Sequence, residues 1–173
     1  MARDVLAHFF YPTANAPLVP ESSAAMSPDS PLHTLIRQPS RALHVAGLGC
    51  RRGCSRVELE HLLHQVLQQH EIALEALDCL ASSAHKAGET GLLELAEHLQ
   101  LPLVWLSAEQ LAPYDGALSS HSLLSKQLTG SAGVAEASAL AQAERASGQN
   151  AQLLGAKLRS ANATCALAVA RLS

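Results

Sequence analysis

Apolar residues in the second part of the chain alternate between short runs and helical spacing. Leu43–Leu48 is a short apolar run rich in glycine at its end, which predicts a buried strand. After it, Ser55 and Glu58 have the spacing of a capping box, in which the serine caps a backbone N–H and the glutamate reaches back. The helix predicted from there has its apolar residues mostly on one face: Val57, Leu59, Leu62, Leu63, Val66 and Leu67.

The same two patterns continue to the end of the chain. A second capping box, Ser107 with Gln110, opens a short helix. The connection 159–163 is short enough for a hairpin. The remaining predicted elements are strands at 77–82, 102–106, 151–158 and 164–171, and helices at 90–99, 121–128 and 134–146.

The order of these elements predicts the fold class. Strands that alternate with helices form a parallel core covered by helices on both faces. The closing hairpin adds at least one antiparallel strand. We therefore expect an α/β fold, a three-layer α/β/α domain with a mixed, mostly parallel sheet and a C-terminal antiparallel hairpin.

The first 40 residues differ in composition from the rest. They contain six of the eight prolines, and no glycine occurs before Gly47. Proline is excluded from helix interiors and from central strands. We expect residues 1–40 to form a flexible leader, with Met26 as an alternative start of the native protein, and residues 41–173 to form the folded domain.

Composition excludes several classes of protein. With 173 residues, 48% hydrophobic and 16% charged, the chain can bury a core and is not intrinsically disordered. A net charge of -3 argues against a general nucleic-acid binder. No apolar run approaches the roughly 20 residues of a membrane span, and no secretory signal is recognisable. Four cysteines are too few for a disulfide scaffold, so a reducing cytoplasm is the expected setting.

A glycine-containing loop, Gly47–Ser55, follows the first predicted strand and includes Gly49, Arg51, Arg52 and Gly53. Ligands of open α/β sheets bind outside the carboxyl ends of the strands. Glycines allow close backbone approach, the following helix start offers free N–H groups, and the arginines are fixed cations. The loop is either an anion site or a tight turn with a solvated basic rim. It matches neither a Walker loop nor the dinucleotide fingerprint, which needs glycine where Arg52 stands.

Cysteine and histidine each leave two readings. Cys50 and Cys54 flank the loop, where a helix start and two arginines could activate a thiol, although small packing residues are the favoured interpretation. His61 and His64 could share a metal ion on one helix face. Because no third ligand can be assigned, we favour surface histidines and expect no metal and no cofactor.

Two further loops are predicted to open at the same edge of the sheet. The first supplies Lys86, which suits an anion, and Glu89, which could orient a ligand, act as a base or form an exposed salt bridge. The second contains Gly133 and leads into a helix with Glu136 in its first turn, as a base or as a complement to the helix dipole. Three loops at one edge predict a ligand site.

The motifs in these loops resemble one known family, and they follow each other in its order. Gly47–Gly53 looks like the opening motif of the cobalamin-biosynthesis family formed by CobE and the C-terminal domain of CbiG. Lys86–Ala96 resembles its Lys-x-x-Glu-x-Gly-Leu-x-x-Leu-Ala segment. The remaining similar segments are Leu101–Leu103, Ser107–Leu111, Gly133–Leu140, Lys157 and Thr164–Arg171. The resemblance covers residues 42 to 171 and departs from the family pattern at Cys54 and Cys165.

The resemblance implies a role in cobalamin (vitamin B12) biosynthesis, within porphyrin and corrin metabolism, near the ring-contraction stage. CbiG has additional N-terminal domains and is associated with opening the lactone of cobalt-precorrin-5A, which releases acetaldehyde. CobE is the stand-alone form of the oxygen-dependent route, whose intermediates are metal-free. Precorrins carry many acetate and propionate side chains, which suits an edge with Arg51, Arg52, Lys86 and Lys157.

Three functions stay open from the sequence. The favoured one is a carrier or auxiliary factor that binds a precorrin or corrin intermediate and hands it to a neighbouring pathway enzyme, because no nucleophile paired with a base is recognisable. The alternatives are a hydrolase of the cobalt-precorrin-5A type, with Glu89 or Glu136 as base, and a structural partner of a pathway enzyme. The predicted ligand-binding residues are Gly47, Gly49, Cys50, Arg51, Arg52, Gly53, Lys86, Glu89, Gly91, Gly133 and Lys157.

Overall fold

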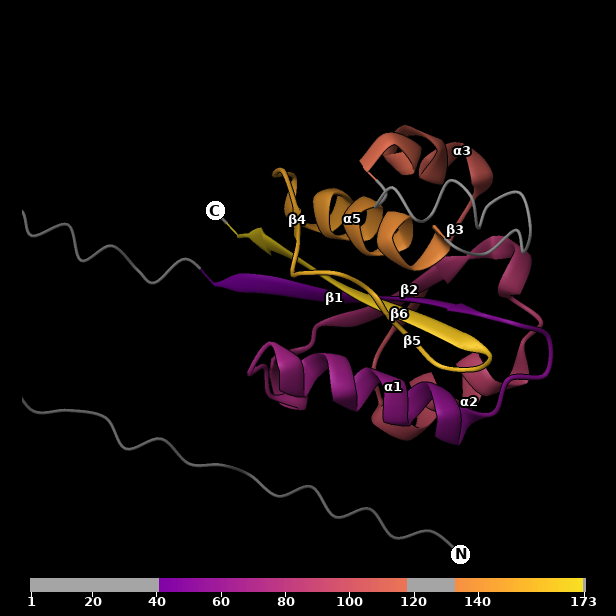
Figure 1. Ribbon diagram of the computed structural model, residues 1–173. Helices are drawn as coiled ribbons and strands as arrows, with labels where there is room; N and C mark the ends of the chain where they lie inside the picture. Colours follow the sequence, from indigo (N-terminus) through magenta and orange to yellow (C-terminus); the bar gives the residue numbers. More distant parts are fainter. Residues whose placement is uncertain (1–40, 118–132, 173) are drawn as a thin grey trace, which may run out of the picture. The chain divides into compact units, whose positions relative to one another are not determined.

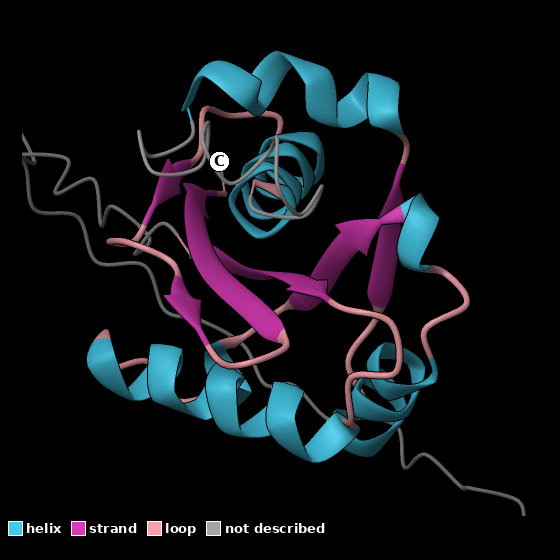
Figure 2. Ribbon diagram, turned by 45° about the vertical axis from the view of Figure 1, so that its right-hand side comes forward, coloured by secondary structure: helices cyan, strands magenta, loops and turns pink. Residues whose placement is uncertain are grey.

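The computed structural model describes residues 41–117 and 133–172, which form one mixed sheet between two layers of helices (Figures 1 and 2). The six strands lie in the order β3-β2-β1-β6-β4, with β5 also paired to β6. The strands are β1 (Ala42–Cys50), β2 (Cys79–Ser83), β3 (Leu103–Leu106), β4 (Gln152–Leu153), β5 (Leu158–Arg159) and β6 (Ala163–Arg171).

Each face of the sheet is covered by helices and closes its own hydrophobic core (Figure 2). Leu48, Leu80 and Leu167 point to the face covered by α1 and α2, whereas Val45, Ala81 and Ala168 point to the face covered by α5. The short helix α3 packs against α5. The helices are α1 (Arg56–Gln69), α2 (Thr90–Leu99), α3 (Ala108–Leu111) and α5 (Val134–Ser147), with 3₁₀ turns η1 (Leu74–Ala76), η2 (Ala84–Lys86) and η3 (Ala112–Ala117).

The α/β class, the helices on both faces and the C-terminal hairpin are confirmed. Strands β1, β2 and β3 are parallel neighbours, whereas β6 is antiparallel to β1, β4 and β5. The antiparallel part therefore includes the long β1–β6 ladder as well as the closing hairpin. The helix predicted at 121–128 and the leader 1–40 lie outside the described residues.

The continuous strand predicted at 151–158 is wrong. The segment forms two strands of two residues, β4 and β5, separated by residues 154–157. Gly155 has a φ of +69°, and an added Cβ there would lie 2.7 Å from Cε1 of His70. Because the backbone turns against His70 at the end of α1, the strand is interrupted.

The capping box predicted at the start of α1 is half right. Ser55 Oγ accepts the backbone N–H of Glu58 at 3.2 Å, as expected. The Glu58 carboxylate instead accepts three hydrogen bonds from the β5–β6 connection: from Ser160 Oγ at 2.5 Å, Asn162 N at 2.8 Å and Asn162 Nδ2 at 3.1 Å. These bonds lower the pKa of Glu58 from its ordinary value of 4.5. The second box, Ser107 with Gln110, has both of its bonds.

Helix α5 approaches the middle of β1 unusually closely. A Cβ added to Gly47 would lie 1.9 Å from the carbonyl oxygen of Ala135, far inside van der Waals contact. The helix face toward the sheet is built of small residues, and Ala135, Ala139 and Ala143 are fully buried. Small side chains on one partner and glycine on the other let the two backbones touch.

A buried ion pair links α5 to the connection between β4 and β5. Lys157 Nζ lies 2.8 Å from Glu136 Oε2, and the two side chains are only 4% and 2% exposed. Charged groups are rarely this buried unless they are paired, because leaving water is costly. The pair therefore fixes the β4–β5 connection against the first turn of α5.

None of the described helices has the length and apolarity needed to cross a membrane.

Replacing Gly47 by alanine tests the close contact with α5. The methyl group cannot fit against the Ala135 carbonyl, so we expect Gly47→Ala to lower the free energy of unfolding by about 3 kcal/mol, at the upper end of the usual cost of overpacking. Gly88→Ala is the control, because nothing lies within 4 Å of a Cβ added there. Thermal and urea unfolding measure both variants. Equal stabilities of the two variants would contradict the packing described for Gly47.

Removing one partner of the buried ion pair tests its energetic weight. We expect Lys157→Met to lower the free energy of unfolding by about 3–5 kcal/mol, because the Glu136 carboxylate stays buried without its lysine. The double variant Lys157→Met with Glu136→Gln should recover much of that loss. Arg41→Met is the surface control, since Arg41 is 75% exposed in its pair with Asp78 and should cost less than about 1 kcal/mol. Similar losses at Lys157 and Arg41, measured in urea, would contradict this account.

Candidate ligand site at the carboxyl edge of the sheet

A tight turn follows the end of β1 at Cys50. The backbone N–H of Cys54 donates to the carbonyl of Arg51 at 3.2 Å, which closes a β-turn over residues 51–54. Gly53, the third residue of the turn, has a φ of +74°, a conformation that favours glycine. The turn leaves Arg51 and Arg52 exposed at the edge of the sheet.

The β5–β6 connection lies on one side of this turn. The backbone N–H of Arg51 donates to the carbonyl of Asn162 at 2.8 Å. Asn162 is also held by Glu58, through its backbone N–H and its side-chain amide. The turn, the first turn of α1 and the hairpin connection are therefore joined by hydrogen bonds.

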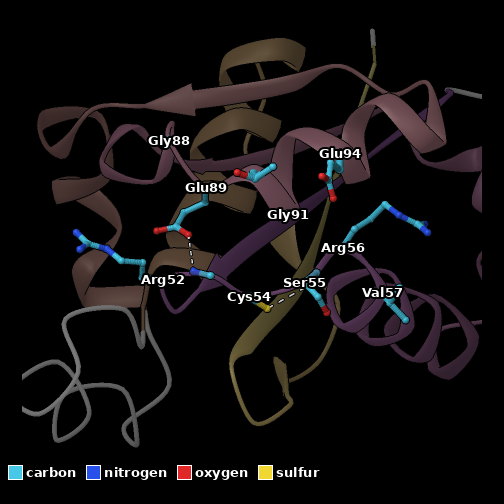
Figure 3. Close-up of a pocket in the computed structure, with 11 residues that line it drawn as sticks. Arg52, Cys54, Ser55, Arg56, Val57, Gly88, Glu89, Gly91 and Glu94 are labelled. Carbon is cyan, nitrogen blue, oxygen red and sulfur yellow. Dashed lines mark hydrogen bonds between the residues drawn. The ribbon is translucent and has the colours of Figure 1, made fainter.

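The start of α2 lies on the other side of the turn. The backbone N–H of Gly53 donates to Glu89 Oε2 at 2.9 Å, the bond marked beside Glu89 in Figure 3. A Cβ added to Gly91 would lie 2.1 Å from the carbonyl oxygen of Cys54, so the two backbones are in contact. The loops at 51–55 and 84–91 meet at one edge, as the sequence predicted.

An open hollow of about 520 Å³ lies between the starts of α1 and α2 (Figure 3). Its charged side chains are balanced: Arg52 and Arg56 on one hand, Glu89 and Glu94 on the other. Arg56 is already paired with Glu60, one turn further along α1. The other residues that line the hollow are Gly53, Cys54, Ser55, Val57, Gly88, Thr90 and Gly91.

Three cations at this edge have no charged partner among the described residues. Arg51 and Arg52 are exposed, Lys86 is half-buried, and none of their side chains makes an ion pair or hydrogen bond with another described residue. Lys86 lies in η2, directly after the end of β2, which is the parallel neighbour of β1. The edge can therefore offer positive charge to an anion.

The cysteines are packing residues. All four are free and buried. Burial raises the pKa of Cys50 in spite of Lys86, and burial followed by the nearby Glu58 raises the pKa of Cys54 to about 12. Such thiols stay protonated at neutral pH, so the structure supports the packing interpretation over a reactive cysteine. Cys79 and Cys165 lie in β2 and β6, as the sequence predicted.

Five more of the predicted site residues lie within β1, at the start of α5 or in the β4–β5 connection. Gly47 and Gly49 are buried inside β1, and the first of them is occupied by its contact with α5. Gly133 is the N-cap of α5. Glu136 and Lys157 are turned toward each other on the face of the sheet covered by α5. The carboxylate predicted as a base and the ammonium predicted to bind a ligand are therefore engaged with each other.

The histidines form no metal site in the described part of the chain, where no group of three His, Cys, Asp or Glu residues could hold a metal ion. His64 and His98 instead flank Glu60, with Nε2 to Oε1 distances of 4.0 Å and 3.3 Å.

The contacts between Glu58 and Asn162 could not be predicted from the sequence. The two residues are 104 positions apart, and no local pattern connects them.

Comparison with known proteins identifies the family. The family model described as "Cobalamin synthesis G C-terminus" matches residues 44–168. Protein CobE of Sinorhizobium sp is 35% identical over 124 residues, which cover 72% of this chain and 78% of that protein. Cobalt-precorrin-5A hydrolase of Salmonella typhimurium is 32% identical over 126 residues, which cover 73% of this chain but only 34% of the hydrolase.

A solved structure supports the same assignment. The crystal structure of CobE, described as a protein from the cobalamin (vitamin B12) biosynthetic pathway, has a TM-score of 0.69 and 45% sequence identity to this chain. The match covers 76% of this chain and 92% of that structure. The resemblance found in the loop motifs is thus confirmed, and the chain belongs to the family of the cobalamin synthesis G C-terminal domain.

Proposed function

We propose that this protein binds a precorrin or corrin intermediate of cobalamin biosynthesis near the ring-contraction stage, as a carrier or auxiliary factor. The ligand is a macrocycle with many acetate and propionate side chains. It is recognised at the carboxyl edge of the sheet through those carboxylates, and it is passed on to a neighbouring pathway enzyme. The protein acts in the cytoplasm, where its four free cysteines stay reduced.

The observation that carries this proposal is the group of three cations without partners at one sheet edge. Arg51 and Arg52 project from the turn after β1, and Lys86 lies on the neighbouring loop. Charge-assisted hydrogen bonds from guanidinium and ammonium groups to carboxylates are stronger than neutral ones, and an arginine can hold both carboxylate oxygens. A polycarboxylate can engage several such cations at once.

The scarcity of aromatic side chains supports recognition by charge. Of the Phe, Tyr and Trp residues, only Trp105 and Tyr114 fall within the described part of the chain. Tyr114 is engaged with Glu144, to which its hydroxyl donates at 2.6 Å. A macrocycle at this edge therefore has few rings to stack on, and its carboxylates supply the main contacts.

Hydrolysis of the cobalt-precorrin-5A type is the second candidate, motivated by the hydrolase relative of which this chain spans about a third. Glu89 is the carboxylate best placed for a base, at the edge of the sheet and in the lining of the hollow. Glu136 is buried in its ion pair with Lys157. We favour binding, because none of the described cysteines is activated as a nucleophile.

Titration with a metal-free corrin polycarboxylate tests the binding proposal. We expect a saturable change in the visible spectrum of the ligand and quenching of Trp105, which is the chain's only tryptophan and is paired with Ser82 near the end of β2. Arg51→Ala, Arg52→Ala or Lys86→Ala should each weaken binding about tenfold, because a hydrogen bond to a charged group contributes roughly 1.5–3 kcal/mol.

Two controls keep this titration specific. Arg171→Ala removes an exposed arginine at the other end of the sheet, at the last residue of β6, and should leave the affinity unchanged. The fully esterified macrocycle lacks the negative charges and should bind poorly. Binding of the ester as tightly as the acid, or no saturable change with the acid, would contradict recognition by charge.

The variant Glu89→Gln separates binding from hydrolysis. Glutamine keeps an acceptor oxygen but cannot take up a proton as the carboxylate does. We expect binding of the corrin polycarboxylate to survive and the rate of acetaldehyde release from a lactone-containing intermediate to be the same as without protein. Acetaldehyde release by the wild type that Glu89→Gln abolishes would instead establish the hydrolase reading.

A further inference from the structure

Two carboxylates hold the Arg51–Cys54 turn from opposite sides. Glu89 takes the backbone N–H of Gly53 directly, at 2.9 Å. Glu58 acts indirectly, through the hairpin connection. Its carboxylate accepts hydrogen bonds from the backbone N–H and the side-chain amide of Asn162. The backbone carbonyl of Asn162 in turn accepts the N–H of Arg51. Both contacts are made to backbone groups or to a neighbouring loop, and neither involves the arginine side chains.

We propose that Glu58 and Glu89 are positioning residues that fix the turn in the conformation that presents Arg51 and Arg52 to an anionic ligand. The part of the inference that concerns the ligand rests on the proposed function. The bracing, meaning the fixing of the turn by these hydrogen bonds, is a property of the chain alone. The proposal gives Glu89 a role other than that of a base. It also gives Glu58 a role beyond the start of its own helix, through its hydrogen bonds to Asn162.

Beyond the hydrogen bond from Cys54 to Arg51 that closes the turn and the burial of Cys54, few contacts hold this turn in place. Arg51, Arg52 and Gly53 are all exposed, so burial contributes little to holding them in place. Gly53, like any glycine, can adopt many backbone conformations when no hydrogen bond holds it. Fixing the loop before the ligand arrives removes part of the entropy cost of binding, which raises affinity without any new contact to the ligand.

The two braces are built differently. Glu58 uses both carboxylate oxygens, with Oε1 accepting from Ser160 and from the backbone of Asn162, and Oε2 accepting from the Asn162 amide. Glu89 uses Oε2 for a single bond to the turn. Beside that bond, the close backbone contact of Gly91 with Cys54 limits how far α2 can move away from the turn.

The sign of the effect on affinity separates bracing from simple electrostatics. Glu89 is a negative charge beside a site for an anion, so its removal should strengthen binding if charge alone matters. Bracing predicts the opposite for Glu89→Ala, because the turn loses its hydrogen bond. Glu89→Gln removes the charge and keeps an acceptor for the N–H of Gly53, so bracing predicts affinity equal to or higher than that of the wild type.

Hydrogen–deuterium exchange of the ligand-free protein measures the bracing itself. We expect Glu89→Ala to speed exchange of the Gly53 amide about tenfold or more, and Glu58→Ala to do the same for Arg51 and Asn162, since weakly held amides exchange through local opening. Glu89→Gln should exchange like the wild type. Glu97 is an exposed residue of α2 whose side chain makes no hydrogen bond or ion pair with another described residue, so Glu97→Ala also removes one negative charge and should leave these amides unchanged.

Titration with a metal-free corrin polycarboxylate then connects the bracing to binding. We expect Glu89→Ala and Glu58→Ala to weaken binding about fivefold to tenfold, with Glu97→Ala unchanged. In a protein that already carries Arg51→Ala and Arg52→Ala, the same two changes should have little further effect, because braces act through the arginines that they position.

The outcomes that would contradict the bracing, the positioning role and the proposed function differ from one another. Wild-type exchange rates in Glu89→Ala and Glu58→Ala overturn the bracing, whatever the ligand does. Faster exchange combined with tighter binding by Glu89→Ala overturns the positioning role and leaves only charge repulsion. A wild type that binds no corrin polycarboxylate refutes the proposed function, and the exchange rates then decide the bracing without any ligand.

Discussion

The backbone contact between α5 and β1 is the constraint on which the remaining structure depends. Gly47 lies in the middle of β1, beneath the carbonyl of Ala135. β1 is the strand that pairs with the parallel half of the sheet through β2 and with the antiparallel half through β6. Because α5 covers this strand at so short a distance, the direction of β1 is fixed, and so is the point at which its end delivers the chain to the Arg51–Cys54 turn.

Glycine has more than one physical role in the motifs that carry the family resemblance. Gly47 and Gly91 stand where a side chain would collide with backbone of another element, at 1.9 Å and 2.1 Å. Gly53 has open space around it but a positive φ. The first two allow close packing and the third closes a turn. The glycines of these motifs are therefore explained by the packing of β1 and α2 and by the closing of the turn.

The sequence predicts elements well where local patterns decide them. The bounds of α2 agree with the prediction because its apolar residues have helical spacing, and Ser55 and Ser107 mark two helix starts correctly. The prediction fails where distant segments decide the outcome. Gly155 turns against His70, and Glu58 turns from its own helix start to Asn162, 104 residues away. The pairing of Glu136 with Lys157 is equally invisible to spacing rules, because it depends on how the hairpin returns to the sheet.

The reactivity of the four buried cysteines toward a thiol reagent can report the local opening of the molecule. Cys50, Cys54 and Cys165 lie in the core between the sheet and α1 and α2, and Cys79 lies in the core beneath α5. A thiol reagent in solution reaches them only when one of these layers separates from the sheet. The order in which the cysteines are alkylated would therefore record which layer opens first, without a mutation or an added label.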